Sequence, residues 1–154
     1  MKRAGFCYVD SSALIKCYVS EQGSRAMQAQ RLRWQGLFTS LLSLAECLAA
    51  TQRLRREWVL SRRESQHVVS MLRADLEAMY VVDVNDTVLK RAPEWAEREP
   101  LRGADLVHAA TALWLCDQGI LKTFIVSDRR LGNAMTALGL EVWDPVKSEG
   151  EADT

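Results

Sequence analysis

The chain has 154 residues, of which 48% are hydrophobic and 26% are charged, and this composition fits one globular domain with a substantial core. Twenty basic residues balance twenty acidic ones, so the overall charge does not indicate a nucleic-acid partner, which only local clusters could reveal. No apolar stretch approaches the roughly 20 residues of a membrane-spanning helix, and Asp10 ends the first apolar run too early for a signal peptide. We therefore expect a soluble, cytoplasmic protein with no membrane partner.

The cysteines also indicate a cytoplasmic protein. They are widely spaced, form no C-x-x-C pair and lie among apolar neighbours: Cys7, Cys17, Cys47 and Cys116. This pattern favours buried, reduced thiols over disulfides or zinc ligands, and reduced thiols are typical of the cytoplasm.

Apolar runs and helical patterns alternate in the first half of the chain. The predicted elements are a strand over 5–9, a helix capped by residues 10–12 and reaching Tyr18, a helix over 23–34, a strand over 37–39 after a break at Gly36, and a helix from Ser40 or Ser43 to Arg55.

The second half continues the alternation. The predicted elements are a helix over 62–79, a strand over 80–84, a helix from Asn85 or Asp86 to about Pro100, an apolar helix over 103–118, a strand over 123–126, a helix over 128–138 and a strand over 140–143. Such alternation predicts an α/β fold in three layers, with helices on both faces of a mainly parallel sheet of about four or five strands. We expect one domain over residues 1–146, followed by an acidic, frayed tail over 147–154.

Four acidic residues stand at the edges of predicted buried elements. Asp10 and Asp128 each end an apolar strand, Glu46 interrupts the apolar face of a helix, and Asp105 opens another helix. In open parallel sheets, ligands bind beyond the carboxyl ends of the strands, so these carboxylates could converge on one cleft.

Each acid also has an ordinary explanation. Helix capping alone accounts for Asp10 and Asp128, and Asp105 could simply complement the dipole of its helix. Glu46 is harder to explain because its neighbours should be buried, and its alternative is a salt bridge to an arginine.

A cluster of all four acids would need cations. Two carboxylates 4 Å apart repel each other by about 4 kcal/mol at an effective dielectric near 20. Oxygen ligands suit Mg²⁺ or Mn²⁺, and such an ion can activate a water and stabilise a phosphoryl oxygen. The set therefore indicates phosphodiester cleavage.

Local cations could guide a polyanionic substrate into such a cleft. Arg129 and Arg130 follow Asp128 directly and could fork onto a phosphate. A second cluster comprises Arg53, Arg55, Arg56, Arg62 and Arg63, for which we favour an ordinary solvated face with ion pairs to Glu57 and Glu64.

Two further features stay open. His108 lies one turn after Asp105 and within reach of the cleft, but a core role explains it equally well, so we assign neither it nor His67 to catalysis. Residues 58–60 could form a dimer or antitoxin surface, or pack into the domain's own core.

With these residues in view, the chain resembles a PIN domain, and specifically the toxin of a VapBC toxin–antitoxin pair. The resemblance lies in residues 8–16, 39–46, 101–110 and 127–131 with Gly139 and Leu140, which follow the family order over nearly the whole length. The Gly-Ala-Asp-Leu-Val-His-Ala-Ala run at 103–110 is its most specific part.

The resemblance implies a Mg²⁺-dependent endoribonuclease in which a metal-activated water attacks the scissile phosphate, leaving a 5′-phosphate and a 3′-hydroxyl. It implies that Asp10 and Asp105 are the principal metal ligands, and that Glu46 and Asp128 complete the pocket. Ser11 or Ser127 would assist by hydrogen bonding. A homodimer and a small VapB-type antitoxin that enters the cleft are also implied.

Other functions compete with an RNA-cleaving toxin. A phosphotransfer domain that is phosphorylated on Asp10 is disfavoured, because Ser12 stands where a second aspartate is expected and no lysine accompanies the late strand. A non-catalytic PIN-like module that binds RNA or protein would not require all four acids. A DNA-directed nuclease would share the metal chemistry, since only contacts to the 2′-hydroxyl distinguish the sugars.

Overall fold

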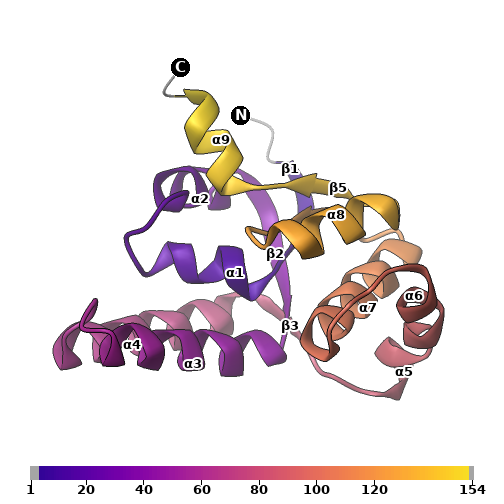
Figure 1. The fold of residues 1–154 in the computed structure, drawn as a ribbon. Helices are drawn as coiled ribbons and strands as arrows, with labels where there is room; N and C mark the ends of the chain where they lie inside the picture. The colour runs from indigo at the N-terminus through magenta and orange to yellow at the C-terminus, as the bar shows by residue number, and fades with distance from the viewer. Residues whose placement is uncertain (1–3, 153–154) are drawn as a thin grey trace.

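The computed structural model describes residues 4–152, and its centre is a five-stranded sheet (Figure 1). The strands are β1 (Ala4–Val9), β2 (Trp34–Ser40), β3 (Tyr80–Val82), β4 (Leu121–Ile125) and β5 (Glu141–Trp143). Their order is β3-β2-β1-β4-β5, and every neighbouring pair is parallel. The expected α/β class with a parallel central sheet is therefore confirmed.

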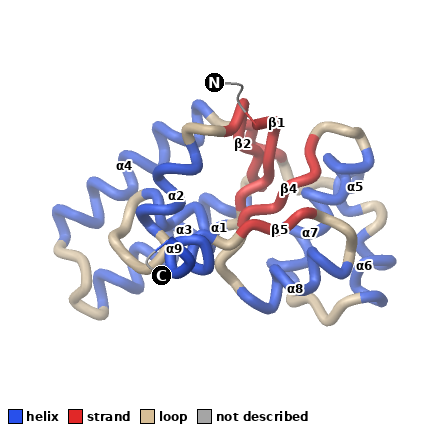
Figure 2. Tube along the Cα trace, turned by 90° about the horizontal axis from the view of Figure 1, so that it is seen from above, coloured by secondary structure: helices blue, strands red, loops and turns tan. Residues whose placement is uncertain are grey.

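Helices cover both faces of this sheet. They are α1 (Ser11–Leu14) with the short 3-10 helix η1 (Ile15–Cys17), α2 (Ser24–Arg31), α3 (Leu42–Arg56), α4 (Arg62–Ala78), α5 (Asp86–Leu89), α6 (Ala92–Arg98), α7 (Gly103–Asp117), α8 (Arg129–Ala137) and α9 (Pro145–Ala152). Figure 2 shows α1 to α4 and α9 on one side of the strands and α5 to α8 on the other. None of the helices within residues 4–152 is long and apolar enough to cross a bilayer.

Alternation along the central strands produces the two cores. Cys7 and Val9 of β1 lie in the core under α1 to α4, whereas Tyr8 between them lies in the core under α6 to α8. Phe124 and Ile125 of β4 divide in the same way. Successive side chains of a strand point to opposite faces, so a sheet covered on both sides needs continuous apolar runs such as these.

The order of the strands creates a switch point between β1 and β4. The chain runs outward from β1 through β2 to β3, and then returns to place β4 on the other side of β1. The hydroxyl of Ser12 accepts hydrogen bonds from the backbone N–H groups of Ser127 and Asp128, at 2.9 and 3.1 Å. The ends of the two central strands are thus tied together where ligands bind in open parallel sheets.

The region around Gly36 differs from the sequence prediction. Helix α2 ends at Arg31, and β2 begins at Trp34 and includes Gly36, which pairs with Phe6. A Cβ atom on Gly36 would lie 2.8 Å from a ring carbon of Tyr80 and 2.9 Å from one of Phe6. The glycine therefore permits close ring packing inside a strand, rather than breaking a helix.

The helix expected from about 86 to 100 is divided in the structure. It forms α5 and α6, and Pro93 stands in the first turn of α6. Proline lacks a backbone donor and clashes with the preceding turn, so it is accommodated where a helix begins.

The C-terminal segment also differs from the frayed tail expected over 147–154. Helix α9 continues to Ala152 and packs against α2. The carboxylate of Glu149 accepts hydrogen bonds from the backbone N–H of Gly23 and from Nε of Arg25, the latter at 3.1 Å. Residues 153 and 154 lie outside the described part of the chain, and the domain boundary at 146 stays a prediction.

Candidate metal centre

Asp10 lies at the carboxyl end of β1, and its position is fixed from several directions. Its backbone N–H donates to the carbonyl of Ile125 at 2.9 Å, which joins it to β4. Its side chain caps α1 by accepting from the backbone N–H of Ser12 at 3.0 Å. Only 3% of the residue is exposed. The capping role considered from the sequence is present, and one carboxylate oxygen remains for other partners.

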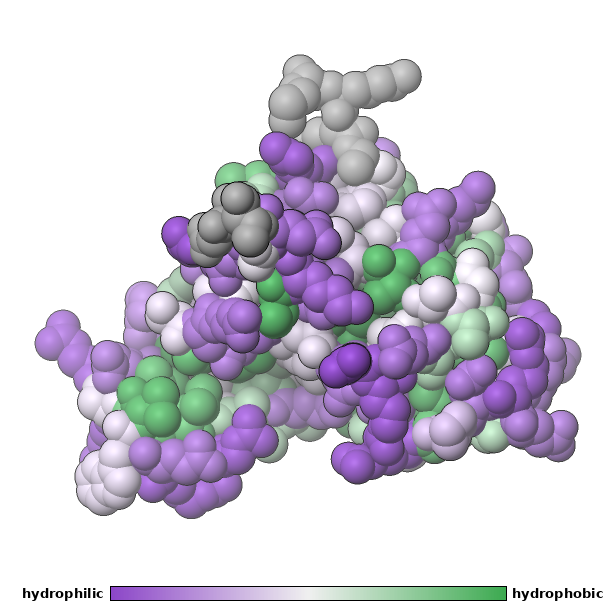
Figure 3. Space-filling view, turned by 45° about the horizontal axis from the view of Figure 1, so that its top comes forward, coloured by the Kyte–Doolittle hydropathy of each residue, from purple (hydrophilic) through white to green (hydrophobic). Residues whose placement is uncertain are grey.

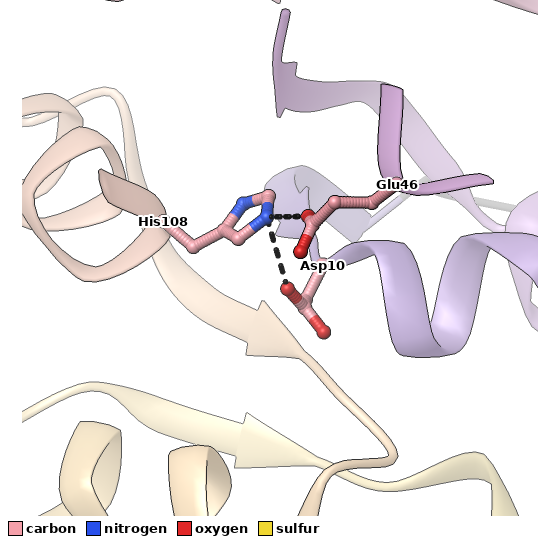
Figure 4. Close-up of side chains that lie close together, drawn as sticks. All are labelled: Asp10, Glu46 and His108. Atoms are coloured by element: carbon pink, nitrogen blue, oxygen red, sulfur yellow. Dashed lines mark hydrogen bonds and ion pairs between the residues drawn. The ribbon is translucent and has the colours of Figure 1, made fainter. Parts of the chain in front are cut away.

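Glu46 from α3 and His108 from α7 face Asp10 across the end of the sheet (Figure 4). Nε2 of His108 lies 2.5 Å from Oε2 of Glu46 and 3.4 Å from Oδ1 of Asp10. Ligand atoms of these three side chains all lie within 4.8 Å of one another, which is close enough for them to share a metal ion. The sequence prediction included both acids but gave His108 no part in the site.

The electrostatics of this cluster couple His108 to both acidic side chains. Burial raises the pKa of Asp10 above its usual value, although the nearby His108 opposes this effect. Burial also acts to raise the pKa of Glu46, but the hydrogen bond and charge of His108 outweigh it, and that pKa is lowered. Burial acts to lower the pKa of His108, but Glu46 and Asp10 outweigh it, and the pKa is raised.

Tyr8 of β1 fixes the orientation of the His108 imidazole. Its hydroxyl lies 2.7 Å from Nδ1 of His108, and its ring is fully buried and stacked on Phe124. A partner on the second ring nitrogen fixes the orientation of a histidine, and such partners are typical of metal sites.

Asp105 lies one turn before His108 but makes a different contact. Its Oδ2 accepts from Nη2 of Arg130 at 2.8 Å and from the backbone N–H of Arg102 at 3.4 Å. Its negative charge contributes to the raised pKa of His108. The structure thus places Asp105 beside the cluster, held by an arginine.

Asp128 caps α8 by accepting from the backbone N–H of Leu131 at 3.0 Å. It lines the same groove as Glu46, with Ser11, Ser12 and Ser127. The structure therefore brings Asp10 and Glu46 together directly and places Asp105 and Asp128 around them.

Comparison with known proteins places this arrangement in a family. A profile described as PIN domain matches residues 7–130, which include Asp10, Glu46, His108 and Asp128. The chain belongs to the PIN-domain family.

Relatives of this PIN domain carry the VapC name. Ribonuclease VapC45 and Ribonuclease VapC49, from two strains of Mycobacterium tuberculosis (CDC 1551 / Oshkosh and ATCC 25618 / H37Rv), are each 33% identical over 138 residues. In both cases the match covers 88% of this chain and 92% of the relative.

Solved structures agree on the fold. The M. tuberculosis toxin VapC20, described as cleaving the sarcin–ricin loop, has a TM-score of 0.61 at 17% identity, covering 87% of this chain and 95% of its own. VapBC2 from Rickettsia felis, bound to promoter DNA, has a TM-score of 0.62 at 10% identity, covering 90% and 98%. A toxin–antitoxin complex from Klebsiella pneumoniae has a TM-score of 0.61 at 14% identity, covering 90% and 97%.

A groove of about 480 Å³ opens beside the Asp10–Glu46–His108 cluster of this PIN domain. Lys16 and Arg53 contribute positive charge to its lining. Lys16 is buried along its stem, and its ammonium group lies 2.8 Å from Glu21. Arg129 and Arg130 are exposed just after Asp128. Anionic ligand groups could therefore approach the acids between fixed cations.

The residues of the PIN domain fit a divalent ion by the chemistry of their donors. Asp10 and Glu46 offer carboxylate oxygens in one cluster, and carboxylates suit Mg²⁺ and Mn²⁺. Oγ of Ser127, which lines the groove, is a buried polar atom with no hydrogen-bond partner in the described part of the chain. An unpaired buried hydroxyl needs a partner such as a water or a ligand oxygen.

Proposed function

We propose that this chain is a divalent-metal-dependent endoribonuclease and the toxin of a type II toxin–antitoxin pair. The observation that carries the proposal is that Asp10, Glu46 and His108 converge on one point, at the switch point between β1 and β4. The ribonuclease names of relatives at 33% identity support RNA as the substrate.

Four acids would hold Mg²⁺, with Mn²⁺ as a plausible substitute. Asp10 and Glu46 would do so from the cluster, and Asp105 and Asp128 from its borders. A bound ion of this kind lowers the pKa of a water and neutralises charge on a phosphoryl oxygen. Arg130 would then exchange its contact with Asp105 for one with the substrate.

The remaining polar side chains would orient the RNA backbone. Ser11 and Ser127 line the groove and can donate hydrogen bonds to phosphate oxygens. Arg129 and Arg130 are exposed at its border and can bind a phosphate in a forked geometry. These assignments make the cations responsible for substrate binding and the acids responsible for the metal.

The proposed partner is a VapB-type antitoxin that neutralises the toxin, and the toxin itself would be a cytoplasmic homodimer. Toxin–antitoxin assemblies from R. felis and K. pneumoniae share this fold, which supports the proposal of an antitoxin. Light scattering of the purified chain would measure the homodimer directly, and a mass of one chain at all concentrations would contradict it.

The first prediction is that Asp10→Asn abolishes RNA cleavage while the protein stays folded. Asparagine keeps an oxygen that can accept from the N–H of Ser12, but it removes the charge that would hold the metal. Cleavage of total RNA with Mg²⁺, followed by sequencing of the RNA ends, measures the activity. Thermal unfolding measures the fold.

Asp144→Asn is the matched control. Asp144 also accepts from the backbone N–H two residues later, at 2.9 Å, but it precedes α9 and belongs neither to the cluster nor to the lining of the groove. We expect this variant to cleave RNA like the wild type. Equal activity in Asp10→Asn and the wild type would disprove the role of Asp10.

A further inference from the structure

The loop end of the α3–α4 hairpin carries an exposed aromatic side chain among arginines. Trp58 is 93% exposed, the highest value among the exposed large hydrophobic residues. Together with Arg55, Arg56 and Arg62 it lines a groove of about 620 Å³, separate from the groove beside the acids. Figure 3 shows a green apolar patch at the left, over this end of the hairpin, where Val59 is 58% exposed.

The backbone holds Trp58 in a conformation that suits glycine. Its φ angle is +62°, and it is the one residue other than glycine with a positive φ in the described range 4–152. The N–H of Trp58 donates to the carbonyl of Arg55 at 3.2 Å, and the N–H of Val59 donates to that of Leu54 at 2.9 Å. These two bonds form a Schellman motif, in which glycine usually occupies the left-handed position.

Packing within the domain does not explain why a tryptophan occupies position 58. A side chain that is almost fully exposed contributes little to packing, and a Cβ atom disfavours the left-handed region. The same hydrogen bonds also hold the backbone of Trp58 at a fixed angle to α3. An unfavourable conformation held by its surroundings is typical of residues that contact a ligand.

The arginines around Trp58 are not neutralised by the protein itself. Among the described residues, no ion pair involves Arg55, Arg56 or Arg62, and Arg55 makes only a 3.5 Å contact with Gln52. Glu64, expected from the sequence to pair with them, instead accepts from the backbone N–H of Ser61 at 2.8 Å. Positive charge is therefore concentrated at this end of a chain whose overall charge is zero.

We propose that the groove around Trp58 is an anchoring surface for single-stranded RNA, separate from the metal centre. The indole would stack on a base, and Arg55, Arg56 and Arg62 would bind the neighbouring phosphates. This combination of an aromatic platform with backbone-binding cations is how proteins hold single strands without reading their sequence. The inference rests on the proposed function and adds a second contact to its substrate.

Helix α3 connects this surface to the cluster of acids. Glu46 and Arg56 are ten residues apart on the helix, which corresponds to roughly 15 Å along its axis. Between them, Arg53 lines the groove beside the acids. A strand anchored at Trp58 could therefore extend along the helix and present another nucleotide to the metal centre.

The test measures RNA affinity without cleavage. A fluorescein-labelled single-stranded RNA is titrated with the full chain in EDTA, and its fluorescence anisotropy is followed at several salt concentrations. We expect Trp58→Gly to weaken binding about tenfold, as the loss of one stacked base predicts. We expect the triple variant R55Q/R56Q/R62Q to weaken binding. Its complex should release about two fewer counterions, which lowers the slope of log affinity against log salt concentration by about two.

Two controls separate binding from folding. Trp58→Gly should unfold at the same temperature as the wild type or higher, because glycine suits the left-handed position. Arg73→Gln replaces an exposed arginine of α4 outside the groove and should bind RNA like the wild type.

Wild-type RNA affinity in both Trp58→Gly and the triple variant would overturn the inference. If those variants instead lost affinity for a protein partner, the surface would belong to that protein and the inference would equally fall. The proposed function is judged separately by cleavage that depends on Asp10. Cleavage with unchanged affinity in both variants would remove only the anchoring surface, whereas binding that depends on Trp58 without any cleavage would remove only the nuclease.

Discussion

Among the single residues of the site, His108 places a basic group between the acidic side chains. Nε2 of His108 lies 2.5 Å from Glu46 and 3.4 Å from Asp10, at the point where a cation shared by these two carboxyl groups would bind. Arg130 has the same relation to Asp105. Basic side chains thus contact the acids, and a metal ion would have to replace these contacts.

The competition at His108 predicts that metal affinity rises with pH. The pKa of His108 is raised, so its proton is retained at the lower end of the neutral range and must be lost or displaced when a metal binds. We expect Mn²⁺ to bind more tightly as the pH rises from about 6 to about 8, and to release protons on binding. Calorimetry in buffers of different ionisation enthalpy measures both effects.

His108→Gln is the control for this prediction. Glutamine cannot hold the proton, so the Mn²⁺ affinity of this variant should depend less on pH than that of the wild type over the same range. The stability of the wild-type fold without added metal depends on pH in the opposite direction. The protonated His108 stabilises the fold below its unfolded pKa of about 6.5, and this contribution is lost as the pH rises through the raised folded pKa. A wild-type affinity that did not change with pH would contradict the competition.

Among the elements, β1 and β2 pair closely because Gly36 has no side chain at the place where three aromatic rings meet. The rings of Phe6, Phe38 and Tyr80 pack against one another, with Phe38 stacked on Tyr80 at a centroid distance of 4.8 Å. They converge on Gly36, where a Cβ would lie under 3.0 Å from two of them. A Cβ atom at position 36 would therefore force the rings of Tyr80 and Phe6 to shift.

Gly36→Ala should consequently destabilise the fold. Overpacking of this kind costs about 1 to 3 kcal/mol, which denaturant unfolding can measure. Gly5→Ala in the neighbouring β1 is the matched control, because nothing lies within 4 Å of its added Cβ. A loss of stability no greater in Gly36→Ala than in Gly5→Ala would show that the rings move aside freely.

The elements also show how far sequence patterns could predict the fold. Apolar runs predicted all five strands, since burial on both faces requires such runs. Helical spacing and capping residues predicted the helices between them, although the one expected from about 86 to 100 is divided into α5 and α6. The extent of β2 was not predicted, because Gly36 suggests a break unless the rings packed against it are known. The helical tail was also missed, since its contact from Glu149 to Gly23 joins residues far apart in the chain.

For the cluster, the sequence predicted Asp10 and Glu46 but not their partner His108. Strand ends and helix starts indicated Asp10 and Asp128, and an acid on a buried helix face indicated Glu46. The place of His108 was missed because its partners Tyr8 and Glu46 come from other elements. The one available signal was its position a turn after Asp105, which a buried core histidine would share.

At the scale of the whole molecule, the site joins parts of the fold that otherwise make separate cores. Asp10 follows β1, Glu46 comes from the helices on one face, and His108 comes from the helices on the other. A cation held by Asp10 and Glu46 together with Asp105 of α7 would link the two layers through the end of the sheet. Metal binding should therefore stabilise the entire domain.

We expect Mg²⁺ to raise the unfolding temperature in a manner that depends on Asp10. Free ion at 100 times its dissociation constant adds about 2.7 kcal/mol to the stability of a protein that binds it only when folded. Differential scanning fluorimetry with and without Mg²⁺ measures the shift in the wild type, in Asp10→Asn and in Asp144→Asn. The shift should persist in Asp144→Asn and disappear in Asp10→Asn, and an equal shift in all three proteins would argue against this metal centre.

The position of β4 in the sheet determines when the cluster of acids can form during synthesis. The centre of the sheet pairs the first strand with one that is translated only after residue 120, and His108 and Asp128 flank that late segment. A ribosome must therefore release most of the polypeptide before the acids can assemble with their partners. Under the proposed function, an incomplete nascent chain would not cleave RNA, and an antitoxin synthesised at the same time would have that interval in which to bind.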